Sequence, residues 1–350
     1  MKRIALFGLI VPSLLTSLVG CGQNPVLEPY TPDPTPIPIG TPSSQQAGFF
    51  PDNRAYYQFV PDPQTAKNVT LQILQNASGN IEMEMDVLTD PDIIQGLEQA
   101  AGRGVSVNVI LDDSSASVAV QQSTINTLRS ANVNVILPHL SGMTVPYLIQ
   151  HGRQLFAQEK DETSVSMTYS APMTAAGLSG EGPALIDLNA NDFGQGLTFF
   201  NGYAQGGSAS GATDMQVTAG PLYTRNYYTS AIAGAKQSLE IENQEISDPA
   251  IVKQLGKMAS SGVNVQIILP SGASSEQSAL KTAGVSQVRL ASASTVPDLM
   301  LVDGTTPLMG DVDLSSECLD HDLTTAFSPN DAGVAGDLDN FFQADWAAAQ

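Results

Sequence analysis

Imidazole is the side chain best suited to act as a nucleophile or as a proton carrier near neutral pH. The chain holds three histidines, His139, His151 and His321. His151 could act as a nucleophile or base, or it could be a hydrogen-bonded turn residue. His139 is expected at the end of a strand. His321 lies between Asp320 and Asp322, where a surface ion pair is the simpler interpretation.

Carboxylates toward the C-terminus offer a second kind of chemistry. Asp303, Asp311 and Asp313, with Glu317 nearby, carry hard oxygen ligands of the type that calcium takes. Their spacing matches no calcium-binding loop, so a solvated acidic rim is the favoured interpretation and a metal site is the alternative. No cofactor is expected.

These residues lie in a chain that repeats itself. Residues 89–94 and 104–111 are echoed by residues 247–252 and 262–269, and both pairs of blocks are 158 residues apart. An ungapped match of this kind indicates a tandem duplication. A further echo relates residues 144–149 to residues 295–300, at a spacing shorter by 7.

Each copy predicts a strand, a helix and a parallel strand. In the first copy these cover residues 81–87, 91–101 and 105–111, with Asp90 as the helix N-cap. The second copy predicts them at residues 238–242, 249–258 and 263–269. A further helix and strand follow in each copy, at 120–130 and 133–137 and at 276–283 and 287–290. The fold class is therefore α/β. Residues 202–220, rich in Gly, Ser and Ala, are expected to form a loop between the copies.

The N-terminus has the parts of a secretory signal: Lys2 and Arg3, an apolar run, and small residues before Cys21. Its Leu-Val-Gly-Cys ending resembles the lipobox of bacterial lipoproteins, which implies cleavage before Cys21 and a lipid anchor on its sulfur. The alternatives are an ordinary signal peptide or a transmembrane helix. Cys318 would then be the only other cysteine, so no intrachain disulfide is expected.

Residues 22–48 are rich in proline and predict an extended tether after the signal peptide of residues 1–21. Because Gly22 does not resemble an aspartate signal for inner-membrane retention, the expected location is the outer membrane or cell surface.

The net charge of −21, from 35 acidic and 14 basic residues, argues against nucleic-acid partners, which are bound through Lys and Arg clusters. The acidity could also serve solubility alone.

The two α/β copies resemble the phospholipase D superfamily, whose members carry two such halves, each with an H-x-K-x-x-x-x-D motif. The resemblance covers about residues 49–349 and includes a Gly-Val-x-Val block in both copies. It implies two tandem α/β/α halves related by pseudo-two-fold symmetry, at residues 49–205 and 206–350. In active members the motif histidines meet between the halves. One attacks phosphorus to form a phosphohistidine, the other protonates the leaving oxygen, and the lysines hold the phosphate.

The second half departs from this motif. Asp303 keeps the aspartate, but Val296 and Asp298 stand at the histidine and lysine positions. Where the family has G-S-x-N, this chain has Asp311 and Asp313 in place of the polar residues. Several carboxylates in the expected phosphate pocket would repel a phosphodiester.

In the first half the histidine and lysine positions are assigned to Val145 and Tyr147, or to Thr144 and Pro146 in a second register. Neither register supplies a histidine or lysine, which leaves His151 as a displaced candidate.

The sequence therefore favours a lipid-anchored, catalytically inactive relative that binds an envelope protein partner or acts as a scaffold. The alternatives are a phosphodiesterase with a rearranged site, and a surface protein whose tether and acidic face matter more than any pocket.

Overall fold

The computed structural model describes residues 56–143, 145, 147–160, 163–178, 182–205, 217–221 and 223–350. The predicted signal peptide with Cys21 and the predicted tether lie outside the described residues, as do Thr144 and Pro146. Within the described part of the chain, no helix is long and apolar enough to cross a membrane.

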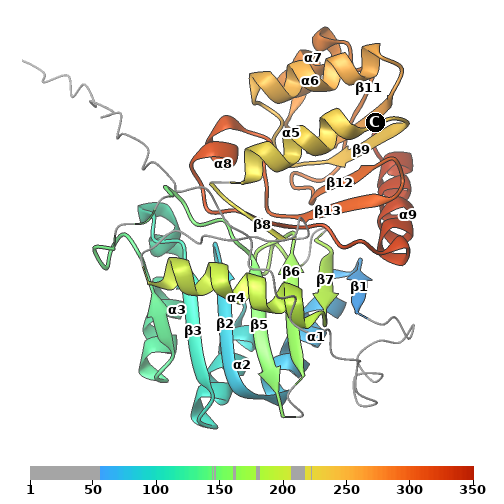
Figure 1. The fold of residues 1–350 in the computed structure, drawn as a ribbon. Helices are drawn as coiled ribbons and strands as arrows, with labels where there is room; N and C mark the ends of the chain where they lie inside the picture. Colours follow the sequence, from blue (N-terminus) through green and yellow to red (C-terminus); the bar gives the residue numbers. More distant parts are fainter. Residues whose placement is uncertain are drawn as a thin grey trace, which may run out of the picture. The chain divides into compact units, whose positions relative to one another are not determined.

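The first half is a seven-stranded sheet with its helices (Figure 1). Its elements are β1 (Tyr57–Val60), α1 (Pro63–Asn76), β2 (Ala77–Met85), α2 (Pro91–Gly102), β3 (Ser106–Leu111), α3 (Ser115–Ser130), β4 (Asn134–Ile136), β5 (Gln154–Glu159), β6 (Ser164–Tyr169), β7 (Ala184–Asp187) and α4 (Ala190–Ala204). The strand order is β4-β3-β2-β5-β6-β7-β1.

The second half forms another seven-stranded sheet. Its elements are β8 (Val217–Ala219), α5 (Thr224–Gly234), β9 (Ser238–Glu242), α6 (Pro249–Ser260), β10 (Asn264–Leu269), α7 (Ser274–Ala283), β11 (Gln287–Leu290), β12 (Asp298–Val302), β13 (Thr306–Gly310), α8 (Ser316–Asp320), β14 (Thr325–Phe327) and α9 (Ala332–Ala348). The strand order is β11-β10-β9-β12-β13-β14-β8.

Strand for strand, the two orders are the same, so the prediction of two duplicated α/β halves is confirmed. The central pairs β2–β3 and β9–β10 are parallel, as predicted, whereas β5 and β12 run antiparallel to β2 and β9. The predicted loop at residues 202–220 is partly wrong, because α4 extends to Ala204 and β8 pairs with β14. Because β8 has only three residues and follows a Gly- and Ser-rich stretch, its sequence shows too little alternation of apolar and polar residues to predict a strand.

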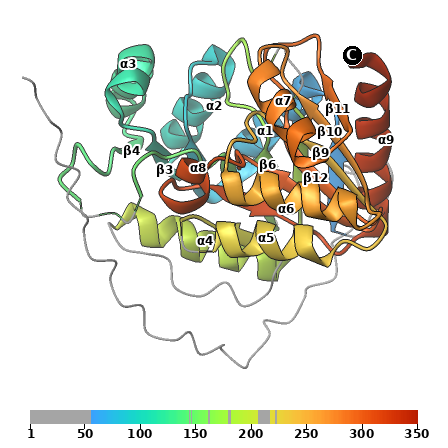
Figure 2. The same cartoon turned by 90° about the horizontal axis from the view of Figure 1, so that it is seen from above.

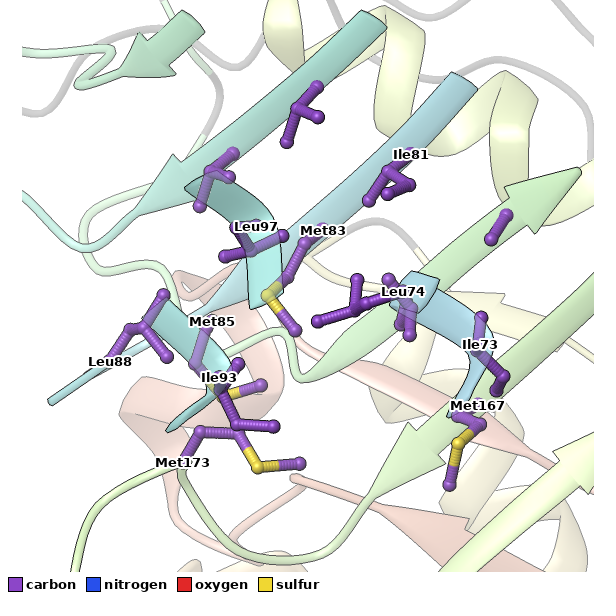
Figure 3. Packing of buried hydrophobic residues seen from close by; sticks show 14 of the residues in the cluster. Ile73, Leu74, Ile81, Met83, Met85, Leu88, Ile93, Leu97, Met167 and Met173 are labelled. Atoms are coloured by element: carbon purple, nitrogen blue, oxygen red, sulfur yellow. The ribbon is translucent and has the colours of Figure 1, made fainter. Parts of the chain in front are cut away.

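Three apolar clusters fill the described structure. One lies between the first sheet and helices α1 and α2; Figure 3 shows Leu74, Met83 and Leu97 meeting in it. A matching cluster lies under α5, α6 and α7. The third joins the halves and takes aromatic residues from both, including Phe156 and Phe327. Helices α4 and α9 contribute to it, and in Figure 2 the strands of the second sheet lie between α7 and α9.

The equivalent helices α2 and α6 begin in the same way. Asp90 and Asp248 are their N-caps, and each accepts two backbone N–H bonds, as Asp90 was predicted to do. Each cap also pairs with a cation of the preceding helix, at 2.8 Å in both cases: Lys67 with Asp90 and Arg225 with Asp248. Burial opposes the charge of Asp248, but its hydrogen bonds from Arg225 and Ser316 lower its pKa.

We predict that Asp248→Ala lowers the free energy of unfolding by about 1–3 kcal/mol, because it removes the cap and leaves the Arg225 pair broken. Asp248→Asn keeps a capping oxygen and is expected to cost less. Urea denaturation near neutral pH measures both. Equal stability of Asp248→Ala and the unmodified chain would contradict the prediction.

Candidate functional site

The strand registers of the two halves show which residues are equivalent. Glu84 on β2 and Glu242 on β9 are related by the 158-residue spacing of the duplication. Glu84 pairs with Gln154 on β5, and Glu242 pairs with Leu299 on β12. Gln154 and Leu299 are therefore equivalent, and the residues just before β5 and β12 can be matched one by one.

By this register, His151 of the first half is equivalent to Val296 of the second, and Arg153 is equivalent to Asp298. The first half therefore keeps the motif histidine and carries an arginine at the lysine position. In the second half Asp298 begins β12, Val296 lies two residues before it, and Asp303 directly follows its end.

The assignment of Val145 and Tyr147 to the first motif is wrong. The chain between that segment and β5 is six residues longer than the sequence echo at residues 144–149 implies. Tyr147 instead packs edge-on against His139 and Tyr203, at ring-centroid distances of 5.5 Å for both pairs. The Thr-Val-Pro echo misled because it stands at different distances before β5 and before β12.

Two adjoining cavities surround the motif residues. The larger, of about 560 Å³, is lined from both halves, by Asp86, His151 and Arg153 on one side and Asp298 and Asp313 on the other. The smaller, of about 480 Å³, adds Glu245, Glu317 and Asp322. His151 and Asp313 line both cavities.

Arg153 is the only lysine or arginine lining either cavity in the described structure. Its Nε and Nη2 donate to Asp86 Oδ2 at 3.0 and 2.8 Å, and Nη1 donates to the Ser170 carbonyl at 2.8 Å. Its backbone N–H donates to Asp311 Oδ2 across the junction of the halves, at 3.0 Å. The guanidinium is thus committed to protein acceptors.

His151 is held at the junction of the halves by its backbone, whose N–H donates to the Leu323 carbonyl at 2.8 Å. Its Nε2 lies 3.5 Å from Asp322 Oδ2, and its side chain is 28% exposed. Burial favours the neutral ring, but Asp322 and the charges of Asp311 and Asp86 raise the pKa of His151. The ring is therefore reachable from the cavities.

The second half supplies buried carboxyls. Asp298 accepts hydrogen bonds from Asn243 and the Gln244 amide, both at 2.9 Å. Burial, and to a lesser extent the nearby Asp311, raise the pKa of Asp298 to about 7. The hydrogen bond from Gln244 and the charge of Arg153 act in the opposite direction and lower it. Asp311 accepts from the Thr325 amide and hydroxyl at 2.9 and 2.7 Å, and burial raises its pKa to about 7.

The remaining candidates have structural roles or lie apart. Asp303 is at the opposite end of β12 from Asp298 and accepts the backbone N–H groups of residues 236–238 at 2.7–3.0 Å. The carboxylate of Asp303 is thus engaged at the start of β9, whereas Asp311 bonds Thr325. No group of three or more metal-ligating side chains is present among the described residues.

The other two histidines lie outside both cavities. His139 bonds Asp113 Oδ1 at 2.7 Å and the Tyr147 carbonyl at 3.0 Å, which fixes its ring. His321 is exposed, as expected. The surface ion pair at this place is formed by its neighbour Asp320 with Arg225. Asp322 instead faces His151.

Sequence reasoning missed Asp86, Arg153 and Asp322. The signal for Arg153 was present, because His151-Gly152-Arg153 has the H-x-K spacing with a conservative cation directly before a strand. Asp322 carries no such signal, since only tertiary pairing of residues 148–151 with 321–323 brings it to His151.

The buried carboxyls should make stability fall as pH rises. Burial, then the charge of Asp311, raises the pKa of Glu84 to about 8, so the folded state binds a proton that the unfolded state has lost above about pH 5. We predict a loss approaching about 1.4 kcal/mol per pH unit between pH 5.5 and 8 from this group. Glu84→Gln is expected to flatten that slope in urea titrations, and Glu98→Gln on α2 is the matched control. An unchanged slope in Glu84→Gln would contradict the assignment.

The family model described as "Cardiolipin synthase, PLD-like domain" matches residues 70–181 and 228–346, one segment in each half. A search of curated proteins by sequence found no match.

Solved structures share the fold. A phosphatidylserine synthase from Haemophilus influenzae superposes with a TM-score of 0.63 at 10% identity, covering 89% of this chain and 88% of that one. A polyphosphate kinase from Porphyromonas gingivalis gives a TM-score of 0.63 at 13% identity and 89% coverage, although this chain spans only 52% of the kinase. At such identities these likenesses concern the fold alone. With the family model matched in both halves, the chain belongs to the phospholipase D superfamily, in its PLD-like domain family.

Proposed function

We propose that this chain is a catalytically inactive member of the superfamily that is anchored by a lipid on Cys21 and works as a binding module at the cell envelope. The observation that carries the proposal is the asymmetry of the two motifs. The first half offers His151 and Arg153, while the second offers Val296 and Asp298 in their place.

Phosphoryl transfer by two histidines needs a nucleophile, an acid and cations around an anionic transition state. Here Val296 replaces one histidine, and Arg153, the only lysine or arginine among the described residues that line the cavities, is held by Asp86. Asp298 and Asp313 line the larger cavity together with His151. Each of these groups, when ionised, adds more than about 1 kcal/mol of repulsion at about 5 Å from a phosphate oxygen, even at an effective dielectric of 20. The site thus disfavours the charge that the chemistry must stabilise.

One observation favours a second candidate, a phosphodiesterase with a rearranged site. His151 stands at the motif position, is reachable from both cavities, and has the carboxylate of Asp322 at 3.5 Å to orient it. In such an enzyme His151 would be the nucleophile, and a protonated Asp298 or Asp313 would have to supply the acid.

The proposals of a lipid anchor and of a tether come from the sequence of residues 1–48. Residues 1–21 resemble a signal peptide that ends in the lipobox-like Leu-Val-Gly-Cys, and residues 22–48 are the proline-rich stretch. An outer-membrane or surface location, with an envelope protein as partner, is the arrangement that this N-terminus supports. The acidic cavities give the module its binding specificity.

We predict that the full chain hydrolyses neither bis(p-nitrophenyl) phosphate nor phosphatidylcholine above the rate without protein, because the second histidine and a free cation are missing. The assay includes His151→Ala and, as a matched control, His321→Ala, which removes an exposed histidine outside both cavities. Turnover that persists in His321→Ala and disappears in His151→Ala would establish the phosphodiesterase and overturn inactivity.

We predict that Cys21→Ser moves the chain expressed in a bacterial host from the membrane fraction to the soluble fraction, because the acylated sulfur is lost. Cys318→Ser is the control, since it removes the other cysteine, whose side chain is buried. Membrane association that is unchanged in Cys21→Ser would rule out the anchor. Detergent phase partitioning and mass spectrometry of the N-terminal peptide measure the result.

A further inference from the structure

The two cavities that meet at His151 are lined by more acidic than basic side chains. The larger presents Asp86, Asp298 and Asp313, and its one cation, Arg153, is already bound to Asp86. The smaller presents Glu245, Asp313, Glu317 and Asp322, and its only basic residue is His151. Such surroundings attract cations and repel phosphates.

A second observation points to a missing ligand. Asp322 is only 2% exposed and lines the smaller cavity, yet its Oδ1 has no hydrogen-bond partner among the described residues. Asp313, which lines both cavities, likewise has Oδ1 buried and without a partner. A buried acceptor left unsatisfied costs about 1–3 kcal/mol, so a donor that reaches these atoms would recover that energy.

The arrangement of the acids selects among cations. No three metal-ligating side chains of the described residues converge, which disfavours a metal ion. The charges are instead spread along two adjoining cavities, of about 560 and 480 Å³. The wall of the larger cavity also includes Pro172, Ala293 and Val296, whose apolar surface suits methylene groups.

We propose that the joined cavities bind a linear aliphatic polyamine, with ammonium groups at Asp298 and Asp313 in the larger cavity and at Asp322 and Glu245 in the smaller. The proposal rests on the binding role proposed above and names the ligand class of that site. Each ammonium donates hydrogen bonds to carboxylates, and the methylene chain lies on the apolar wall.

Binding of a polycation should release protons. Burial, then the charge of Asp298, raises the pKa of Asp313 to about 8, so this carboxyl is largely protonated near neutral pH. The groups that face it are Asp298 on β12, His151 and Arg153 before β5, and Glu245 after β9. An ammonium placed among them favours the charged carboxylate, so affinity should rise with pH as the acids ionise.

The test is isothermal titration calorimetry of the full chain with spermidine at about pH 6 and about pH 8, in buffers of different ionisation enthalpy. We expect saturable binding, at least about tenfold tighter at the higher pH, with proton release visible in the buffer dependence. Butylamine, with one ammonium, is expected to bind at least about tenfold more weakly.

Asp313→Asn and Asp322→Asn should each weaken spermidine binding by about tenfold or more, since both keep the side-chain shape and lose the charge. Glu98→Gln, which removes a carboxylate outside both cavities, should leave binding unchanged. Circular dichroism verifies that each variant is folded, and either aspartate variant alone suffices for the comparison.

Three results would overturn the proposal. They are no saturable heat with spermidine, a weakening by Glu98→Gln equal to that of the aspartate variants, or displacement of spermidine by an equal concentration of magnesium chloride. The last two would mean general attraction to an acidic surface. Absence of spermidine binding together with absence of hydrolysis would refute the ligand class and leave the inactive module standing. Hydrolysis that requires His151 would refute the proposed function whatever spermidine does.

Discussion

The ion pairing of the largely buried Arg153 is the interaction on which the centre of this protein depends. Around it lie Asp86, Asp298 and Asp311, carboxyls that would repel one another without it. The guanidinium holds the end of β2 through Asp86 and the end of β6 through the Ser170 carbonyl, and its amide reaches Asp311 in the other half. Removal of one member of a buried ionic network costs far more than an exposed pair contributes, so this arginine serves as a structural residue.

The two motifs show which positions the fold needs and which the chemistry needs. Asp303 accepts the amides of residues 236–238 and so fixes the start of β9, a role that does not depend on any substrate. Val296 is buried and packs in the cluster between the halves, where an apolar side chain serves as well as an imidazole. The second half can therefore retain its architecture without its chemistry.

Much of the fold could be predicted from local signals. The N-caps Asp90 and Asp248, the parallel strands and the duplication all follow from spacing within a few residues. The site was harder because it forms where distant segments meet. The register of β5 depends on the length of the loop before it, and the neighbour of His151 depends on pairing with residues near 322. Sequence periodicity carries no information about either.

The contact between the last helix and the first strand has a consequence for how the chain acquires its structure. Phe341 on α9 packs edge-on against Phe59 on β1, at a centroid distance of 5.7 Å, across almost the whole described sequence. The β1 side of this aromatic cluster is therefore covered by an element of the other half. Because contacts so distant along the chain form slowly, the final packing of the first half depends on the docking of α9 from the second half.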